Sequence, residues 1–208
     1  MLPPTAMMSF KEGVETVRFA RKVVDFVVKQ KPLLEVKLND VFQQKRGVFV
    51  TLLTFPRKNL RGCIGIPDPV MKLQDAIREA ASSATRDPRF PPVNQKELGN
   101  IIVEVTLLTK PELINVENPK DYLSQIVVGR DGLIAEKGFF KGLLLPQVPV
   151  EYNWDVEEFL SQTCMKAGLP PDAWFDKETK IYRFSGQIFA EKEPYGDVEE
   201  RRIDRKSC

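Results

Sequence analysis

The stretch Leu60-Arg61-Gly62-Cys63-Ile64-Gly65 combines strand-forming residues with a guanidinium and a thiol. Side chains alternate between the two faces of a strand, so one apolar face is expected from Leu60, Ile64 and Ile66. The opposite face then carries Arg61, Cys63 and Gly65. Gly62 falls on the core side, where the absence of a side chain lets another element approach the backbone closely. The stretch therefore predicts a strand with a candidate site on one face.

The segments on either side of this strand predict a hairpin before it and a helix after it. Residues 47–53 are rich in β-branched and aromatic residues, which favours a strand antiparallel to the next one. Asp68 suits a helix N-cap and Pro69 the first helical position. A straight helix from Pro69 to Arg86 would be about 27 Å long, at about 1.5 Å per residue. Asp87 and Arg89 are then expected far from the thiol unless the chain folds back.

The rest of the chain alternates helical and extended patterns. Ser9 and Glu12 form a capping box before a helix that ends by Pro32. Strands are expected at residues 101–109, 139–145 and 181–190, and helices at residues 119–125 and after Asp155. Asp131-Gly132 predicts a two-residue hairpin turn between strands at residues 126–130 and 133–136. Strands outnumber helices, so we expect an α+β fold with a mainly antiparallel sheet flanked by helices.

The amino-acid composition excludes several classes of catalytic and metal site. The chain has no histidine, which excludes Ser-His-Asp and Cys-His catalysis and any metal site that needs imidazole. Its three cysteines, Cys63, Cys164 and Cys208, form no C-x-x-C pair, so free thiols and no metal site are expected. The net charge of +2 gives little attraction to nucleic acid or membranes. With no apolar run near ~20 residues and no signal-peptide pattern, a cytoplasmic protein is expected.

The LRGCIG hexapeptide resembles the signature of the AMMECR family, named for the Alport syndrome, midface hypoplasia and elliptocytosis candidate region. Further segments fit the family: GVFVTL (47–52), DPRFPP (87–92), VEVTLLT (103–109), GRDGLI (129–134) and GLLLPQVP (142–149). The resemblance is to prokaryotic members and implies one α+β domain over residues 1–190 with two unequal lobes. It also implies a fold of the RAGNYA type. Residues 191–208 are charged and are expected to form a flexible tail.

Cys63 is the candidate catalytic residue, because Arg61 on its own face and a nearby helix start would favour the thiolate. The alternative is a small apolar residue that serves the strand only. Arg61, Gly62 and Gly65 are candidate substrate-binding residues, with Asp87 and Arg89 as weaker ones that also suit a local turn. Glu104 lies among apolar residues of a strand, so it is either a half-buried general base with a raised pKa or an exposed carboxylate. Cys164 lies on an apolar helix stripe and is expected in the core.

Three functions follow from these features. The first is a cysteine-containing enzyme, or enzyme subunit, with a cleft at the LRGCIG strand. The resemblance implies a modification pathway shared with Memo-type and radical-SAM proteins. The second is a module that binds a nucleotide, a peptide or RNA without chemistry; phosphate-binding loop motifs are absent and the basic clusters are short. The third is an interaction scaffold in which LRGCIG is structural. The sequence names no cofactor.

Overall fold

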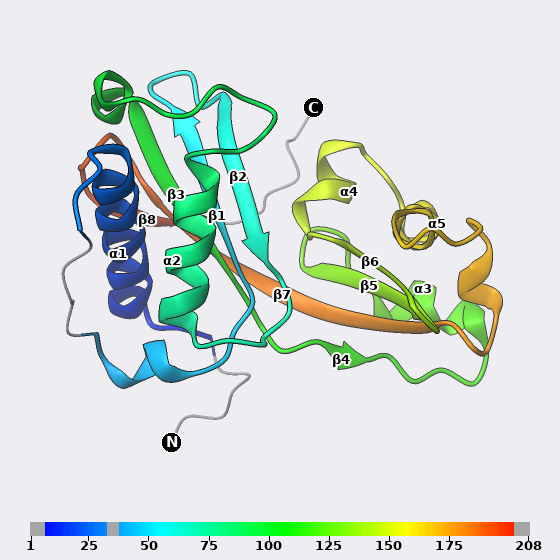
Figure 1. Ribbon diagram of the computed structural model, residues 1–208. Helices are drawn as coiled ribbons and strands as arrows, with labels where there is room; N and C mark the ends of the chain where they lie inside the picture. Colours follow the sequence, from blue (N-terminus) through cyan, green and yellow to red (C-terminus); the bar gives the residue numbers. More distant parts are fainter. Residues whose placement is uncertain (1–6, 33–37, 202–208) are drawn as a thin grey trace. The chain divides into compact units, whose positions relative to one another are not determined.

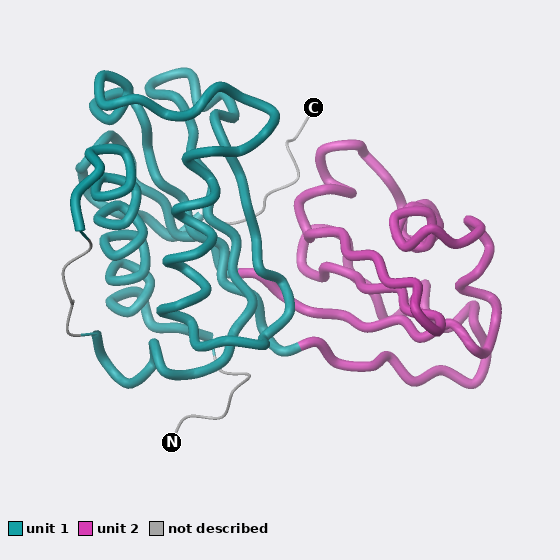
Figure 2. Tube along the Cα trace, viewed as in Figure 1, with its two compact units in different colours: residues 1–110, 187–202 teal, residues 111–186, 203–208 magenta. Residues whose placement is uncertain are grey.

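The structure, a computed structural model, describes residues 7–32 and 38–201. The chain divides into two compact units, which Figure 2 shows in different colours. Within the described residues, unit 1 comprises residues 7–32, 38–110 and 187–201, and unit 2 comprises residues 111–186. The strand β7 (Lys180–Glu191) contributes its first part to unit 2 and its last part to unit 1. Cys208 and residues 202–207 of the predicted tail lie outside the described residues.

Unit 1 is an antiparallel sheet with two helices on one face (Figure 1). The strand order is β2-β1-β3-β7, and β8 also pairs with β7. Besides the end of β7, its elements are α1 (Phe10–Val28), η1 (Asp40–Gln43), β1 (Val48–Thr54), β2 (Leu60–Ile66), α2 (Leu73–Ala84), η2 (Gln95–Asn100), β3 (Ile101–Leu108) and β8 (Val198–Arg201).

The core of unit 1 lies between the helices and one face of this sheet. Val50 of β1 pairs with Ile64 of β2 and with Val105 of β3, so these side chains share the helix-facing side. The alanine-rich stripe of α2, which includes Ala76 and Ala80, is fully buried against them. Small side chains let the helix lie close to the sheet. Leu60 does not join this face as predicted and is exposed, because the β1–β2 register shifts between Leu52 and Leu53.

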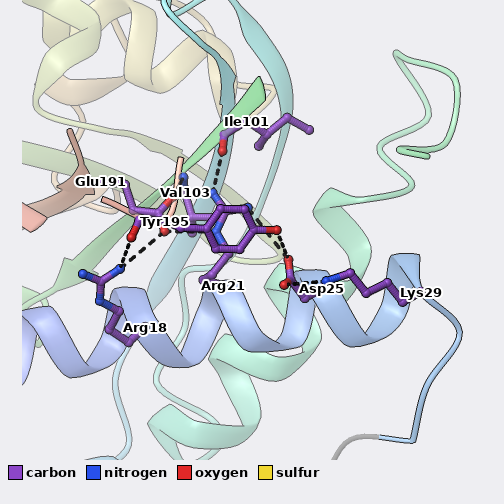
Figure 3. A network of polar contacts seen from close by, with 8 residues as sticks. All are labelled: Arg18, Arg21, Asp25, Lys29, Ile101, Val103, Glu191 and Tyr195. Atoms are coloured by element: carbon purple, nitrogen blue, oxygen red, sulfur yellow. Dashed lines mark hydrogen bonds and ion pairs between the residues drawn. The ribbon is translucent and has the colours of Figure 1, made fainter. Parts of the chain in front are cut away.

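A buried ion pair ties α1 to the sheet (Figure 3). The Arg21 guanidinium donates to the Glu191 carboxylate, through Nε at 3.0 Å and through Nη2, and to the carbonyl oxygen of Ile101 at 2.5 Å. Glu191 also accepts the backbone N–H of Val103 at 2.9 Å. The Tyr195 ring covers the Arg21 guanidinium, with 4.5 Å from Cζ to the ring centroid. One helix is thereby tied to two strands and the β7–β8 turn.

Unit 2 has its own antiparallel sheet and its own core. The strand order is β7-β5-β6, and β4 also pairs with β7. Besides the start of β7, its elements are β4 (Glu112–Leu113), η3 (Pro119–Asp121), α3 (Tyr122–Gln125), β5 (Asp131–Lys137), β6 (Phe140–Leu144), α4 (Gln147–Glu151), α5 (Val156–Lys166) and η4 (Ala173–Phe175).

The core of unit 2 lies under α5, whose first turn is capped as predicted: the Asp155 carboxylate accepts the N–H of Glu158 at 2.8 Å. Cys164 is fully buried in this core, also as predicted, and burial raises the pKa of its thiol to about 11. The close packing depends on Gly142, where a Cβ atom would lie 2.2 Å from the backbone nitrogen of Ala167. Cys164 is therefore a packing residue.

The predicted hairpin turn at Asp131-Gly132 is wrong. Both residues belong to β5, and the tight turn lies at Gly138 and Phe139, between β5 and β6. The Asp131 carboxylate closes the preceding turn by accepting the N–H of Val127 at 2.8 Å. Gly132 is small because the ring of Phe184 fills the space of a side chain. Asp131 therefore ends the preceding turn, and Gly132 allows the close contact with Phe184.

The prediction of a flexible tail from residue 191 is wrong for its first part. Glu191 ends β7, and Val198–Arg201 form β8, paired antiparallel with β7 from Ile188 to Glu191. Charges on this strand do not prevent pairing, because Val198 reaches the core and Arg201 finds carboxylate partners. In the part of the chain that the structure describes, no helix has the length and apolar character needed to cross a membrane.

Candidate functional site

Three polar side chains form a row on the sheet face of unit 1 opposite the helices. Cys63 of β2 pairs with Thr51 of β1, and Thr51 pairs with Glu104 of β3. The Thr51 hydroxyl donates to the Cys63 sulfur, with 3.4 Å from Oγ1 to Sγ. All three residues are half-buried. We call this set, Cys63, Thr51 and Glu104, the thiol row.

The carboxylate end of the thiol row is held by the C-terminal strand of unit 1. Arg201 of β8 donates from Nη1 to Glu104 Oε2 at 2.8 Å and from Nε to Glu199 Oε1 at 3.1 Å. Burial raises the pKa of Glu104, and the positive charges of Arg201 and Lys58 oppose the rise. Of the two alternatives that the sequence left open for Glu104, the structure shows the half-buried carboxylate. Its role as a general base stays a prediction.

Asp87 and Arg89 bind the outer edge of β2, and we call them the edge clamp. Asp87 Oδ2 accepts the backbone N–H of Cys63 at 2.9 Å, and Arg89 Nη2 donates to the Cys63 carbonyl at 3.2 Å. Arg89 also donates to both oxygens of Asp87, at 3.0 and 2.6 Å. Because β2 ends the strand order, these contacts satisfy edge groups that would otherwise lack a partner. Since the backbone of Cys63 points outward, Cys63 and Thr51 form a non-hydrogen-bonded pair, in which side chains are closest.

The chain folds back, so Asp87 and Arg89 lie beside Cys63 and the separation expected from a straight helix over Pro69–Arg86 does not occur. The helix α2 begins at Leu73 after an N-cap at Lys72, not at Asp68 and Pro69, and it ends at Ala84. The chain returns along β2, so that the end of α2 lies beside Gly62. Asp87 follows three residues later, next to Cys63.

The predicted activation of Cys63 by Arg61 is also wrong. Arg61 forms a two-pronged ion pair with Glu97, with Nε–Oε1 at 2.7 Å and Nη2–Oε2 at 3.1 Å. Burial raises the pKa of the Cys63 thiol, and the negative charges of Glu104 and Asp87 add to the rise. The Thr51 hydroxyl and the charge of Arg89 oppose it. At neutral pH the thiol is therefore protonated and needs a base to become a nucleophile.

The two glycines of the hexapeptide have packing roles. A Cβ atom on Gly62 would lie 2.2 Å from the carbonyl oxygen of Ala84, so this position lets the end of α2 approach β2. A Cβ atom on Gly65 would lie 2.2 Å from the ring of Phe49, which covers that position. The close approach expected at Gly62 is confirmed. Substrate binding by either glycine stays a prediction.

Thr51, Glu97 and Arg201 complete this region, and the sequence interpretation missed all three. The sequence could have indicated Thr51, because the predicted β1–β2 hairpin places a residue of β1 beside Cys63. No sequence pattern indicates Glu97 or Arg201, since their partners Arg61 and Glu104 lie 36 and 97 residues away in the chain. Among the described residues, no three His, Cys, Asp or Glu side chains cluster as metal ligands would.

The edge clamp is expected to make the stability of the fold depend on pH in acid. Its hydrogen bonds hold the pKa of Asp87 well below the usual range, chiefly through Arg89, although burial opposes this. A carboxylate with a depressed folded-state pKa stabilises the fold above its unfolded pKa of ~3.9, and this stability is lost as the pH falls through the folded pKa. Asp87→Asn should lower the free energy of unfolding by about 1.5–3 kcal/mol at neutral pH. Urea titrations between pH 7 and 2 measure this, and the gap to the parent protein should shrink in acid.

The matched control is Asp172→Asn, because Asp172 is exposed in unit 2. It should unfold within about 0.5 kcal/mol of the parent protein at every pH. A gap between Asp87→Asn and the parent that stays constant down to pH 2 would contradict the assignment of this acid sensitivity to Asp87.

Comparison with known proteins places the chain in a family. The AMMECR1 family model matches residues 17–189. Protein MJ0810 of Methanocaldococcus jannaschii is 56% identical over 198 residues, covering 95% of this chain and 98% of that protein. A protein of Methanothermobacter thermautotrophicus is 56% identical over 189 residues, covering 89% and 97%.

A solved structure supports the same placement. The crystal structure of PH0010 from Pyrococcus horikoshii, described as an uncharacterised protein, superposes with a TM-score of 0.84 at 46% identity. The match covers 94% of this chain and 98% of PH0010. The names of these relatives assign them no activity, so the chemistry has to be argued from the site. The chain belongs to the AMMECR1 family.

Proposed function

We propose that this chain is an enzyme, or the thiol-bearing subunit of one, in which Cys63 is the nucleophile and Glu104 the general base. The observation that carries the proposal is the thiol row: a thiol, a hydroxyl and a carboxylate aligned across three adjacent strands. Neighbouring strands are about 4.8 Å apart, so β2 and β3 are about 10 Å apart, and Thr51 lies on the strand between them. A raised pKa makes Glu104 a better proton acceptor.

Acyl transfer is the reaction class that these groups support best, because a thiol and a carboxylate supply its nucleophile and its proton carrier. In this structure the Thr51 hydroxyl donates to the sulfur, so the relay begins when the hydroxyl rotates to donate to Glu104 instead. The Cys63 proton then passes to the Thr51 oxygen while the hydroxyl proton passes to Glu104. The sulfur then forms a bond to the acyl carbon, and the bond to the leaving group breaks. Glu104 returns the proton to the leaving group, again through Thr51. The acceptor then attacks the acyl carbon and the carbon–sulfur bond breaks. Glu104 takes the proton of the acceptor and returns it to the Cys63 sulfur through Thr51.

The pathway and the partners of this chemistry follow from the family resemblance. A modification pathway shared with Memo-type and radical-SAM proteins is the setting we propose, with the LRGCIG strand as the site. Such a partner would supply or accept the group that Cys63 carries.

The test is the pH dependence of alkylation of Cys63 by iodoacetamide, with Cys164 and Cys208 replaced by serine. If Glu104 acts as a base, Glu104→Gln should slow the reaction of the folded protein at pH 7 about tenfold or more. Thr51→Val should slow it similarly, because the valine keeps the shape and removes the hydroxyl. Arg61→Ala is the matched control and should leave the rate unchanged, since Arg61 pairs with Glu97.

Electrostatics alone predicts the opposite result. The charge of Glu104 raises the pKa of Cys63, so its removal would lower that pKa and speed alkylation if Glu104 were only a neighbour. A faster reaction of Glu104→Gln, or labelling of Cys63 only after unfolding, therefore overturns the catalytic proposal.

A non-catalytic role is the second candidate, and one observation favours it. Arg61 and Arg89 already pair with carboxylates of the same chain, so their charges serve the fold. Binding of a nucleotide, peptide or RNA through Arg61 would have to displace Glu97. If Cys63 proves inert, an interaction scaffold with LRGCIG as a structural strand is the better description.

A further inference from the structure

The hairpin between β5 and β6 in unit 2 exposes aromatic side chains. Phe139 at its tip is 105% exposed, and Phe140 beside it is 56% exposed. Gly138 has a φ of +59°, which makes the tight turn that projects Phe139. Phe175 of η4, at 45% exposed, stacks on Trp174 with 3.7 Å between ring centroids. Exposed apolar side chains gathered in one region commonly mark an interaction site.

These aromatic residues line two grooves that meet. One groove, of about 540 Å³, is lined by Lys137, Phe139, Phe140, Leu169 and Glu178, with Gly138 at the turn. The other, of about 400 Å³, includes Leu169, Phe175 and the acidic residues Asp172 and Asp176. Lys137 and Leu169 line both grooves, so the two are adjacent. We call the pair the unit 2 groove.

The charge of this groove is negative. Its lining holds one cation, Lys137, and three carboxylates, Asp172, Asp176 and Glu178, which leaves a net charge of −2. The Lys137 ammonium is already bound, at 2.6 Å from Asp176 Oδ2 and 3.7 Å from Glu178 Oε2. The side chain of Glu178 is 80% exposed. The groove therefore offers an apolar floor and an acidic rim.

We propose that the unit 2 groove docks a segment of a partner protein in which leucine or phenylalanine is flanked by lysine or arginine. The apolar side chain would fill the floor between Phe140 and Leu169, and the flanking cations would face Asp172 and Glu178. An anionic bilayer would be repelled by the same rim, and so would a second copy of this surface. The proposal is independent of the thiol row, which lies in unit 1.

The experiment uses the full chain and an array of fluorescein-labelled hexapeptides that permute lysine or arginine with leucine or phenylalanine. Fluorescence anisotropy should show saturable binding by at least one member. Phe139→Ser should weaken that binding about tenfold or more, as expected when an aromatic side chain that the bound peptide covers is removed. Glu178→Lys should weaken it too, and a version of the peptide with glutamates in place of its cations should not bind.

Two matched variants keep the test specific. Tyr152→Ser removes another exposed aromatic side chain of unit 2, and Glu117→Lys reverses another exposed charge there. Both should bind the peptide as the parent protein does. Failure of every peptide to bind, equal binding of the glutamate version, or losses shared by the matched variants would overturn the proposal. Binding to phosphatidylserine vesicles, or Phe139-dependent dimers in sedimentation, would do so as well.

Discussion

Replacement of Arg21 by methionine is expected to lower the free energy of unfolding of unit 1 by about 3–5 kcal/mol. The Arg21 side chain is 5% exposed and the Glu191 side chain is fully buried, so the substitution removes the hydrogen-bonded cation from a carboxylate in the core. Glu191 keeps the N–H of Val103 and the more exposed Arg18 at 3.9 Å, but a neutral donor and a longer ion pair do not offset the cost of burying the charge. Glu191→Leu should cost a similar amount, because it leaves the guanidinium buried (Figure 3).

The double variant Arg21→Met/Glu191→Leu distinguishes a buried charge from lost packing. An apolar pair of similar volume removes both charges, so the double variant should be closer to the parent than either single variant. The carbonyl of Ile101 and the N–H of Val103 lose their partners, so some cost remains. Equal or additive losses would show that the charges themselves matter little. Lys29→Met is the control at an exposed ion pair and should cost at most about 1 kcal/mol.

The measurement has to report on unit 1. Both tryptophans, Trp154 and Trp174, lie in unit 2, so their fluorescence follows that unit. Hydrogen–deuterium exchange of the β1 and β3 amides reads the stability of unit 1 directly. Loss of protection in β1 and β3 with unchanged tryptophan fluorescence is the expected pattern for Arg21→Met.

Most of the helices and strands were predicted from local sequence patterns, because each pattern involves residues that are close together in the chain. The Ser9–Glu12 capping box marks the start of α1, and Asp155 marks the start of α5. The antiparallel pairing of residues 47–53 with the LRGCIG strand is confirmed, as is the α+β class. Each of these depends on a period or a cap that spans only a few residues.

The candidate site was predicted less well, because its electrostatics depend on partners distant in sequence. The distance from Arg61 to Cys63 in the sequence suggested an activated thiol, but Glu97 takes the guanidinium. The direction of α2, which returns along β2, decides that Asp87 reaches Cys63, and Lys72 before Leu73 makes no side-chain cap that would locate the helix start. The charge of residues 191–208 suggested a flexible tail, whereas Arg201 of β8 forms ion pairs with Glu104 of β3 and with Glu199 of its own strand.

Gly62→Ala is expected to be the most damaging single-methyl change in the hexapeptide, with a loss of about 1–3 kcal/mol or more in the free energy of unfolding. The added Cβ would meet the backbone carbonyl of Ala84, which cannot move without the end of α2. Gly65→Ala should cost less, because the ring of Phe49 can rotate away. Gly99→Ala is the matched control: among the described residues, no atom beyond its own neighbours in the chain lies within 4 Å of the position that its Cβ would take. It should be neutral or stabilising by up to about 1 kcal/mol.

The same substitution tests whether the hexapeptide and the edge clamp form one structural unit. Displacement of Ala84 also displaces Asp87, whose Cβ lies 3.5 Å from the position of the added atom. Gly62→Ala should therefore weaken the bond from the Cys63 N–H to Asp87, and its cost should overlap with that of Asp87→Asn. Urea unfolding of the double variant should show a loss smaller than the sum of the two single losses, because neighbours that share a contact are not additive. Additive losses, within about 0.5 kcal/mol, would mean that Gly62 packs against α2 without holding the clamp on Cys63.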